Sequence, residues 1–196
     1  LSHRADSVFR ALEEIEFDGL NPKDYGVAEI LKLRETLLAN PQKDLSLWAD
    51  LDILLTNALL KYGAHLLNGK VDPTLLDKSW NFSKRETEKP LFELLISAYE
   101  TNTLNTFFKA LRPQNPLYLN SRKTLKNYTL LQKNGGWQKL VWQGKKTKLE
   151  PGDTNVFVFA LRNRLAQEGF LDSANYTTDS VYDLPLQAAV AQFQQQ

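Results

Sequence analysis

Side chains capable of covalent chemistry are scarce in this sequence. It contains no Cys and only two His residues, His3 and His65. The absence of Cys excludes a thiol nucleophile, a disulfide and a zinc–thiolate site within these 196 residues. A Ser–His–Asp arrangement would need His3, near the start of the chain, or His65, and no nucleophile-elbow motif accompanies either. We therefore expect no catalytic residues, and a structural role for His65 in a helix.

Metal-binding and acid–base motifs are absent as well. Two widely separated His residues do not provide a ligand spacing such as His-Glu-x-x-His, so we predict no metal site and no cofactor. Glu13, Glu14 and Glu16 are near neighbours in a predicted helix, where we expect a solvated face. A muramidase-like enzyme would instead need two carboxylates across a cleft, which makes this the weakest functional hypothesis.

The strongest local binding signal lies between residues 137 and 148. Trp137 and Trp142 precede the run Lys145-Lys146-Thr147-Lys148. Aromatic faces and ammonium groups suit sugar rings and carboxylated peptides, or single-stranded nucleic acid. The alternative is a solvated connector whose Trp side chains pack on the domain. With 24 basic and 23 acidic residues, the chain lacks the concentrated positive charge that nucleic-acid binding requires, so we predict no nucleic-acid partner.

The rest of the sequence, which must position the candidate residues, is dominated by helical patterns. The strongest pattern is an apolar stripe at Leu47, Leu51, Leu55, Ala58, Tyr62 and Leu66. Asn68-Gly69 should end that helix, with Gly in the left-handed conformation. We predict an all-α fold, with helices near 6–17, 23–38, 45–67, 90–99, 104–111, 116–132, 155–168 and 184–195.

The composition changes after residue 134. Asn134-Gly135-Gly136 interrupts the helical pattern, and the aromatic, basic stretch that follows is predicted to be extended, with a short strand left open. We predict a helical scaffold domain at 1–134, an extended connector at 135–150 and a small helical module at 151–196. Hydrophobic residues make up 42% of the chain, and no apolar run approaches the roughly 20 residues of a membrane span.

Three segments resemble the scaffold region of the large periplasmic L,D-transpeptidases. They are LDILLTNALLKYGAHLLNGKVDP at 51–73, LRPQNPLY at 111–118 and GGW at 135–137. In that family, a long helix ends in a Gly-x-Val-Asp-Pro turn and is followed by a Pro-rich corner and a Gly-Gly-Trp connector.

Two further segments resemble the opening of the small helical peptidoglycan-binding module of the same proteins. They are LEPGDTNVFVFALRNRLAQEGFL at 149–171 and YDLPLQAAVAQFQ at 182–194. Much of this pattern also has a purely structural interpretation. Val158, Leu161 and Leu165 share one helical face, Gly169 suits a C-cap that needs positive φ, and Asp183 is a suitable N-cap. The module of the family continues into a Gly-rich turn and a final helix, so we expect an incomplete module here.

The resemblance implies a non-catalytic cell-wall fragment located in the periplasm or cell envelope. Its expected partners are peptidoglycan and the catalytic domain of the same parent chain, an L,D-transpeptidase that cross-links stem peptides. The His and Cys of that domain are absent here, so we expect the fragment to be inactive. The chain does not begin with Met, and we expect a processed or excised segment whose signal peptide, if present, lies upstream of Leu1. The alternative is an independent helical protein–protein interaction module.

Four residues are predicted to contact peptidoglycan: Trp137, Asp153, Arg162 and Tyr182. Arg162 follows the apolar Leu161 and is expected to face outward. Asp153 has an alternative role as the N-cap of the helix that follows it. Tyr182 has an alternative role in closing the small core.

Overall fold

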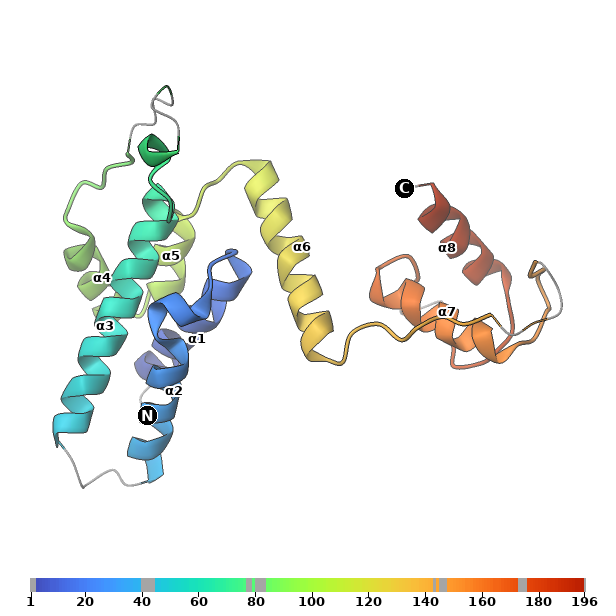
Figure 1. The fold of residues 1–196 in the computed structure, drawn as a ribbon, viewed down its shortest axis with the longest axis horizontal. Coiled ribbons are helices and arrows are strands. Elements are labelled where there is room, and N and C mark those ends of the chain that lie inside the picture. The colour runs from blue at the N-terminus through green and yellow to red at the C-terminus, as the bar shows by residue number, and fades with distance from the viewer. Residues whose placement is uncertain are drawn as a thin grey trace. The chain divides into compact units, whose positions relative to one another are not determined.

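The computed structural model describes residues 3–39, 45–76, 79, 84–142, 144, 148–172 and 176–195. Across these ranges the chain forms eight α-helices and no β-strand, which confirms the predicted all-α fold (Figure 1). The only pairing of extended backbone among them is one isolated antiparallel bridge between Thr154 and Val181. The chain divides into two compact units, Leu1–Asn127 and Tyr128–Gln196. We describe each unit by itself.

The N-terminal unit is built around its longest helix. Helix α3 contacts α1, α2, α4 and α5 and lies among them in Figure 1. Of the predicted apolar stripe, Leu51, Ala58, Tyr62 and Leu66 are buried. Its other two members, Leu47 and Leu55, are half-buried against the same core. The helices of this unit are α1 (His3–Phe17), α2 (Val27–Ala39), α3 (Leu45–Asn68), α4 (Leu91–Glu100), α5 (Leu104–Leu111) and the greater part of α6 (Pro116–Lys133).

Glycines end two elements of this unit. Gly69 has φ +82° directly after α3, as predicted, and its amide donates to the carbonyl of His65. The helix predicted at 23–38 is instead divided. A 3-10 turn at Pro22–Tyr25 ends at Gly26, which has φ +66°, and α2 begins at Val27. The side chain of Asn21 caps the short turn by accepting a hydrogen bond from the amide of Lys23 at 3.1 Å. The left-handed Gly26 therefore divides the segment that was predicted as one helix.

The C-terminal unit contains α7 (Val156–Gln167) and α8 (Leu184–Gln194). Its core consists of Val158, Leu165, Leu171, Tyr182, Leu186 and Ala189. Backbone hydrogen bonds join the segment before α7 to the segment before α8: Gly152 donates to Tyr182, and Tyr182 donates to Asp153, each at 2.8 Å. The two segments therefore fix where both helices begin.

None of the described helices is both long enough and apolar enough to cross a membrane.

Candidate functional site

Arg162 lies in the interior of the C-terminal unit, so the prediction that it faces outward is wrong. Its side chain has no exposed surface. Arg162 follows Val158 by four residues and precedes Leu165 by three, which places it on the core face of α7, whereas Leu161 is only half-buried. The side chain is thus in a position where it stabilises the fold.

Three oxygen atoms compensate the buried guanidinium of Arg162. Its Nη2 donates to the carbonyl of Val181 at 2.7 Å, to Oδ2 of Asp183 at 3.0 Å and to Oδ1 of Asp179 at 3.4 Å. A buried cation is tolerated only when it is paired in this way. Asp183 also caps α8 as predicted, because its Oδ1 accepts a hydrogen bond from the amide of Leu186 at 2.8 Å. The carboxylate of Asp183 therefore links α7, through Arg162, to the first turn of α8.

Tyr182 takes its alternative, structural position. The residue is 6% exposed and belongs to the small core, and burial raises the pKa of its phenol. Asp153, in contrast, is not the N-cap of α7, and that prediction is wrong. The helix begins at Val156, within one residue of the predicted start, and Asn155 caps it by accepting from the amide of Phe157 at 2.8 Å. Asp153 Oδ2 instead accepts from the amide of Glu150 at 2.9 Å within the preceding turn.

Of the four residues predicted to contact peptidoglycan, Trp137 is the most exposed, at 38%. The guanidinium of Arg164 lies 3.7 Å from the centroid of its indole ring, and Tyr128 packs edge-on against it at 5.5 Å. Such a cation–π contact stabilises the connector against α7. This arrangement matches the packed alternative for Trp137 more closely than an open platform for a sugar ring.

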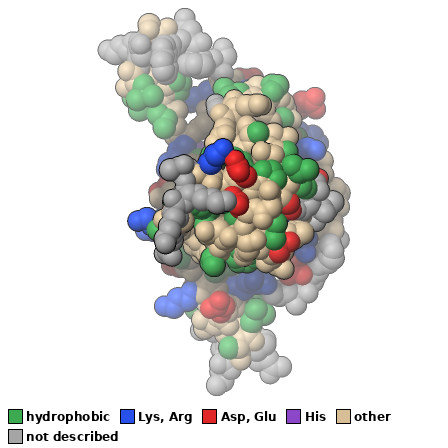
Figure 2. Space-filling view, turned by 90° about the vertical axis from the view of Figure 1, so that its right-hand side faces the viewer, with side chains coloured by type: hydrophobic (Ala, Val, Ile, Leu, Met, Phe, Trp, Pro, Cys, Tyr) green, Lys and Arg blue, Asp and Glu red, His purple; other side chains and the backbone are tan. Residues whose placement is uncertain are grey.

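Only one residue of the predicted basic run can be placed. Residues 145–147 lie outside the described residues, and Lys148 forms an exposed ion pair with Glu150 at 2.6 Å. On the face shown in Figure 2, the described Lys and Arg side chains lie apart from one another, among neutral and acidic residues. They do not form a continuous basic patch on that face.

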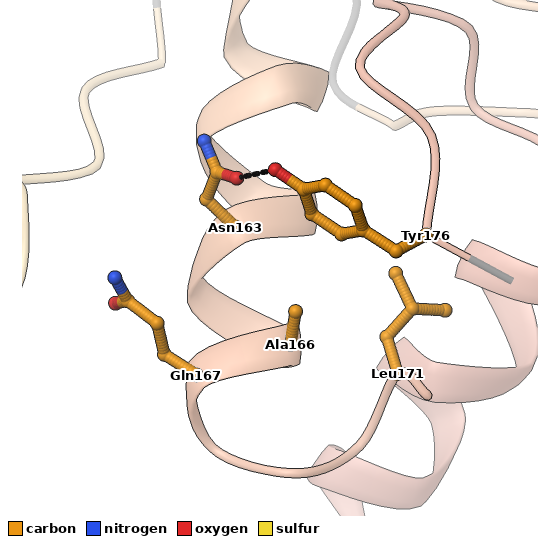
Figure 3. Close-up of a pocket in the computed structure, with 5 residues that line it drawn as sticks. All are labelled: Asn163, Ala166, Gln167, Leu171 and Tyr176. Carbon is orange, nitrogen blue, oxygen red and sulfur yellow. Dashed lines mark hydrogen bonds between the residues drawn. The ribbon is translucent and has the colours of Figure 1, made fainter. Parts of the chain in front are cut away.

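A pocket of about 500 Å³ opens to solvent beside α7 (Figure 3). Ala166 and Leu171 contribute an apolar surface, and the phenol of Tyr176 lies across from the helix. The hydroxyl of Tyr176 donates a hydrogen bond to Oδ1 of Asn163. Gln167 completes the described lining from the exposed side of α7. The volume lies within the range of small-molecule sites.

Sequence reasoning missed this pocket as a site. The available signal was the spacing of Asn163 and Gln167, because residues four apart on a helix share one face. Carboxamides can both donate and accept hydrogen bonds, so such a pair can orient a neutral polar ligand. The position of Tyr176, which approaches from the loop after α7, could not be inferred from a local pattern.

A second polar cluster lies in the N-terminal unit, around the carboxylate of Asp18. The side chain of Asp18 has no exposed surface. Arg112 Nε lies 2.9 Å from both of its oxygens, and Arg122 Nε donates to Oδ1 at 2.6 Å. The hydroxyl of Tyr118 donates to Oδ1 at 2.7 Å, and that of Tyr62 donates to Oδ2 at 2.5 Å. Several strong donors therefore compensate one buried carboxylate.

Both phenols in this cluster remain protonated donors over the ordinary pH range. Burial, followed by the neighbouring Asp18, raises the pKa of Tyr62 and of Tyr118. Glu14 extends the cluster: it pairs with Arg122, and Lys126 Nζ lies 3.5 Å from its Oε1. The expectation that Glu14 lies on a solvated face is therefore wrong, because α6 packs its basic side chains against that end of α1.

Comparison with known families gives the affiliation of the chain. A family described as "Scaffold domain" matches residues 1–125, which is well over half of the 196 residues. The chain belongs to this Scaffold domain family. No curated protein and no solved structure matches the chain. The residues that surround Asp18, from Glu14 to Arg122, all lie within the matched range, so the cluster is a feature of the scaffold domain.

His65 has a structural position in the scaffold domain, next to Tyr25. Its Nδ1 forms a hydrogen bond of 2.7 Å with the hydroxyl of Tyr25, whose ring packs edge-on against the imidazole. Burial first, and then the charges of Lys61 and Lys70, lower the pKa of His65. Among the described residues, no cluster of three or more potential metal ligands occurs.

Proposed function

We propose that the chain is a non-catalytic, wall-binding portion of an L,D-transpeptidase-like protein of the periplasm or cell envelope. In this proposal the scaffold domain positions a catalytic domain of the same parent chain, and the C-terminal unit holds peptidoglycan. The parent enzyme would transfer an acyl group from a stem peptide to a Cys and then to an amine, which forms a 3→3 cross-link. The present chain has no Cys, so we expect it to have no such activity by itself.

The observation that carries the proposal is the meeting of two resemblance segments at Asp18. Tyr62 comes from the long-helix segment at 51–73, and Arg112 and Tyr118 come from the Pro-rich segment at 111–118. Both segments contribute side chains to the same buried cluster, so both are needed to build this domain. Their contact supports the resemblance to the transpeptidase scaffold region.

The C-terminal unit supports the second half of the proposal. Residues of the module pattern, including Val158, Leu165, Leu171, Leu186 and Ala189, pack into a core of their own. Arg162, Asp183 and Gly169 then serve as an ion pair, a cap and a left-handed turn. A small unit with its own core and an open pocket is suited to holding a wall polymer beside a catalytic domain.

Co-sedimentation with insoluble peptidoglycan sacculi tests this proposal. We expect the purified chain to sediment with sacculi and to remain in solution with cellulose of equal mass. We also expect no turnover of stem tetrapeptides by the chain alone. Recovery of the chain in the supernatant with both polymers would contradict wall binding.

A stand-alone protein–protein interaction module is the alternative function. The observation that favours it is an apolar stripe on α4, where Phe92, Ile96 and Tyr99 are 52%, 52% and 41% exposed at positions i, i+4 and i+7. Exposed apolar patches often mark interaction surfaces. Light scattering tests it, because a stable dimer over a wide concentration range would favour this alternative over wall binding.

A further inference from the structure

The sequence contains two Asn-Gly pairs, Asn68-Gly69 and Asn134-Gly135, each at the C-terminal end of a long helix. In such a pair the carboxamide carbon of Asn can be attacked by the next backbone nitrogen, because Gly has no side chain to shield that nitrogen. Whether the attack occurs in a folded chain depends on how firmly the structure holds the carboxamide and the amide. The two pairs differ in both respects.

The structure restrains the first pair. Asn68 is the last residue of α3, and its Oδ1 accepts a hydrogen bond from the amide of Arg85 at 2.8 Å. The amide of Gly69 closes a helical turn by donating to the carbonyl of His65 at 2.9 Å. Both bonds must break before the nitrogen of Gly69 can reach the side chain of Asn68.

The second pair has fewer restraints. Asn134 lies one residue beyond α6, its side chain is exposed, and its carboxamide has no hydrogen-bond partner among the described residues. The amide of Gly135 donates to the carbonyl of Gln132 at 3.1 Å, which is the longer and tighter-turn bond of the two pairs. An added Cβ at Gly135 or Gly136 would meet no atom within 4 Å, so the space around the pair is open.

We propose that Asn134 is a site of spontaneous deamidation. The backbone nitrogen of Gly135 loses its proton to hydroxide and attacks Cγ of Asn134. A bond forms between that nitrogen and Cγ, the bond between Cγ and Nδ2 breaks, and ammonia leaves with a proton taken from water. Water then opens the five-membered succinimide: attack at Cγ gives Asp, and attack at the backbone carbonyl carbon gives an isoaspartyl residue.

Both products change the junction between α6 and the connector. Each places a carboxylate beside the last carbonyls of α6, where the helix dipole disfavours negative charge. The isoaspartyl product also routes the main chain through Cγ, which adds one methylene to it. The amides of residues 134–136 close the end of α6 on residues 130–132, so these bonds should weaken. The reaction does not depend on wall binding, and sedimentation with sacculi does not bear on it.

Incubation of the full chain at mildly alkaline pH, followed by tryptic digestion and mass spectrometry, tests the proposal. Cleavage after Lys61 and Lys70 isolates Asn68, and cleavage after Lys133 and Lys139 isolates Asn134. The same incubation in urea gives both rates in the unfolded chain, where only the local sequence differs. We expect the ratio of the Asn134 rate to the Asn68 rate to be about threefold to tenfold higher in the folded chain, because Asn68 must first break its hydrogen bond with Arg85.

A matched pair of variants gives a second readout on the folded protein. In Asn134→Gln and Asn68→Gln the longer side chain would have to close a six-membered ring, which forms more slowly. Both residues are exposed, so neither change should unfold the chain. We expect Asn134→Gln to remove most of the acidic form that ion-exchange chromatography separates after incubation, and Asn68→Gln to leave it unchanged. An equal rate ratio in buffer and in urea, or an acidic form that survives Asn134→Gln, would overturn the proposal.

Discussion

Arg112 Nε donates to both carboxylate oxygens of Asp18, each at 2.9 Å, across 94 positions of sequence. The contact fixes the segment after α1 against the corner between α5 and α6. The same guanidinium donates to the hydroxyl of Tyr62 at 2.8 Å, which adds α3 to the arrangement. A long-range polar cluster, in addition to the apolar core, therefore specifies how the helices of the scaffold domain meet.

Asp18→Asn should strongly destabilise the scaffold domain. The substitution removes the negative charge while Arg112 stays buried, and breaking a buried pair costs about 3–5 kcal/mol. Asp6→Asn is the matched control, since Asp6 is 52% exposed and forms only a long ion pair with Arg34, worth about 0–1 kcal/mol. Hydrogen exchange of the α3 amides gives the free energy of opening. Similar values for the two variants would refute the structural role of Asp18.

The helices themselves were largely predictable, because local spacing determines them. The apolar stripe of α3 and the stop at Gly69 follow from periodicity and from the conformational freedom of Gly. The Asp18 cluster could not be predicted in this way, because its members come from four separate parts of the chain. Glu14 shows the consequence: in a single helix it looks solvated, and only the packing of α6 changes that.

His65 should make the stability of the scaffold domain decrease in mild acid. Burial and the charges of Lys61 and Lys70 lower its pKa in the folded chain, while the charge of Asp24 opposes them. The unfolded chain therefore takes up the proton at higher pH, near the ordinary value of about 6.5. The free energy of unfolding is then greatest above that value and decreases as the pH falls through it toward the folded pKa.

His65→Gln isolates this contribution. Gln keeps a polar side chain next to Tyr25 but does not titrate. Urea unfolding at pH 5, 6 and 7, followed by circular dichroism, should show a weaker dependence on pH in the variant than in the parent chain. Carboxylates such as Asp24 titrate in both proteins and cancel in the comparison. Parallel curves for the two would rule out a role for His65 in acid sensitivity.

Arg162→Ala should destabilise the C-terminal unit selectively. It leaves a cavity in the small core and removes the cation that pairs with Asp179 and Asp183, which together cost on the order of 2–4 kcal/mol. Arg164→Ala is the control, because that side chain is 29% exposed and should cost about 1 kcal/mol. Hydrogen exchange should increase in α7 and α8. An increase in α3 instead, or equal effects of the two variants, would contradict this assignment.

Gly169→Ala should destabilise the turn after α7 by about 1–2 kcal/mol, because Gly169 has φ +84°. An added Cβ would meet no atom within 4 Å, so the backbone conformation alone sets the cost. Gly169→Asn should cost less, since Asn tolerates the left-handed region better. Thermal unfolding of the two variants measures the difference. Equal melting temperatures for Ala and Asn would argue against backbone strain.

The candidate site was less predictable than the helices. Asp183 and Gly169 could be assigned because caps and left-handed turns have strong residue preferences. Arg162 was misplaced because a charged residue on a core face is an exception to the usual pattern, and only its acceptors reveal why it is buried. The lining of the pocket depends on Tyr176, which a loop brings to α7, and loop geometry has no periodic signal.

Hydrogen exchange of the full chain in the presence of sonicated sacculi tests the central claim most directly, because it shows which amides the wall polymer protects. The account predicts slower exchange in the described parts of 149–195, with the largest change around α7, and unchanged exchange in α3 and α5. Protection confined to the scaffold domain, or none at a sacculus concentration that sediments the chain, would contradict the claim that the C-terminal unit holds peptidoglycan.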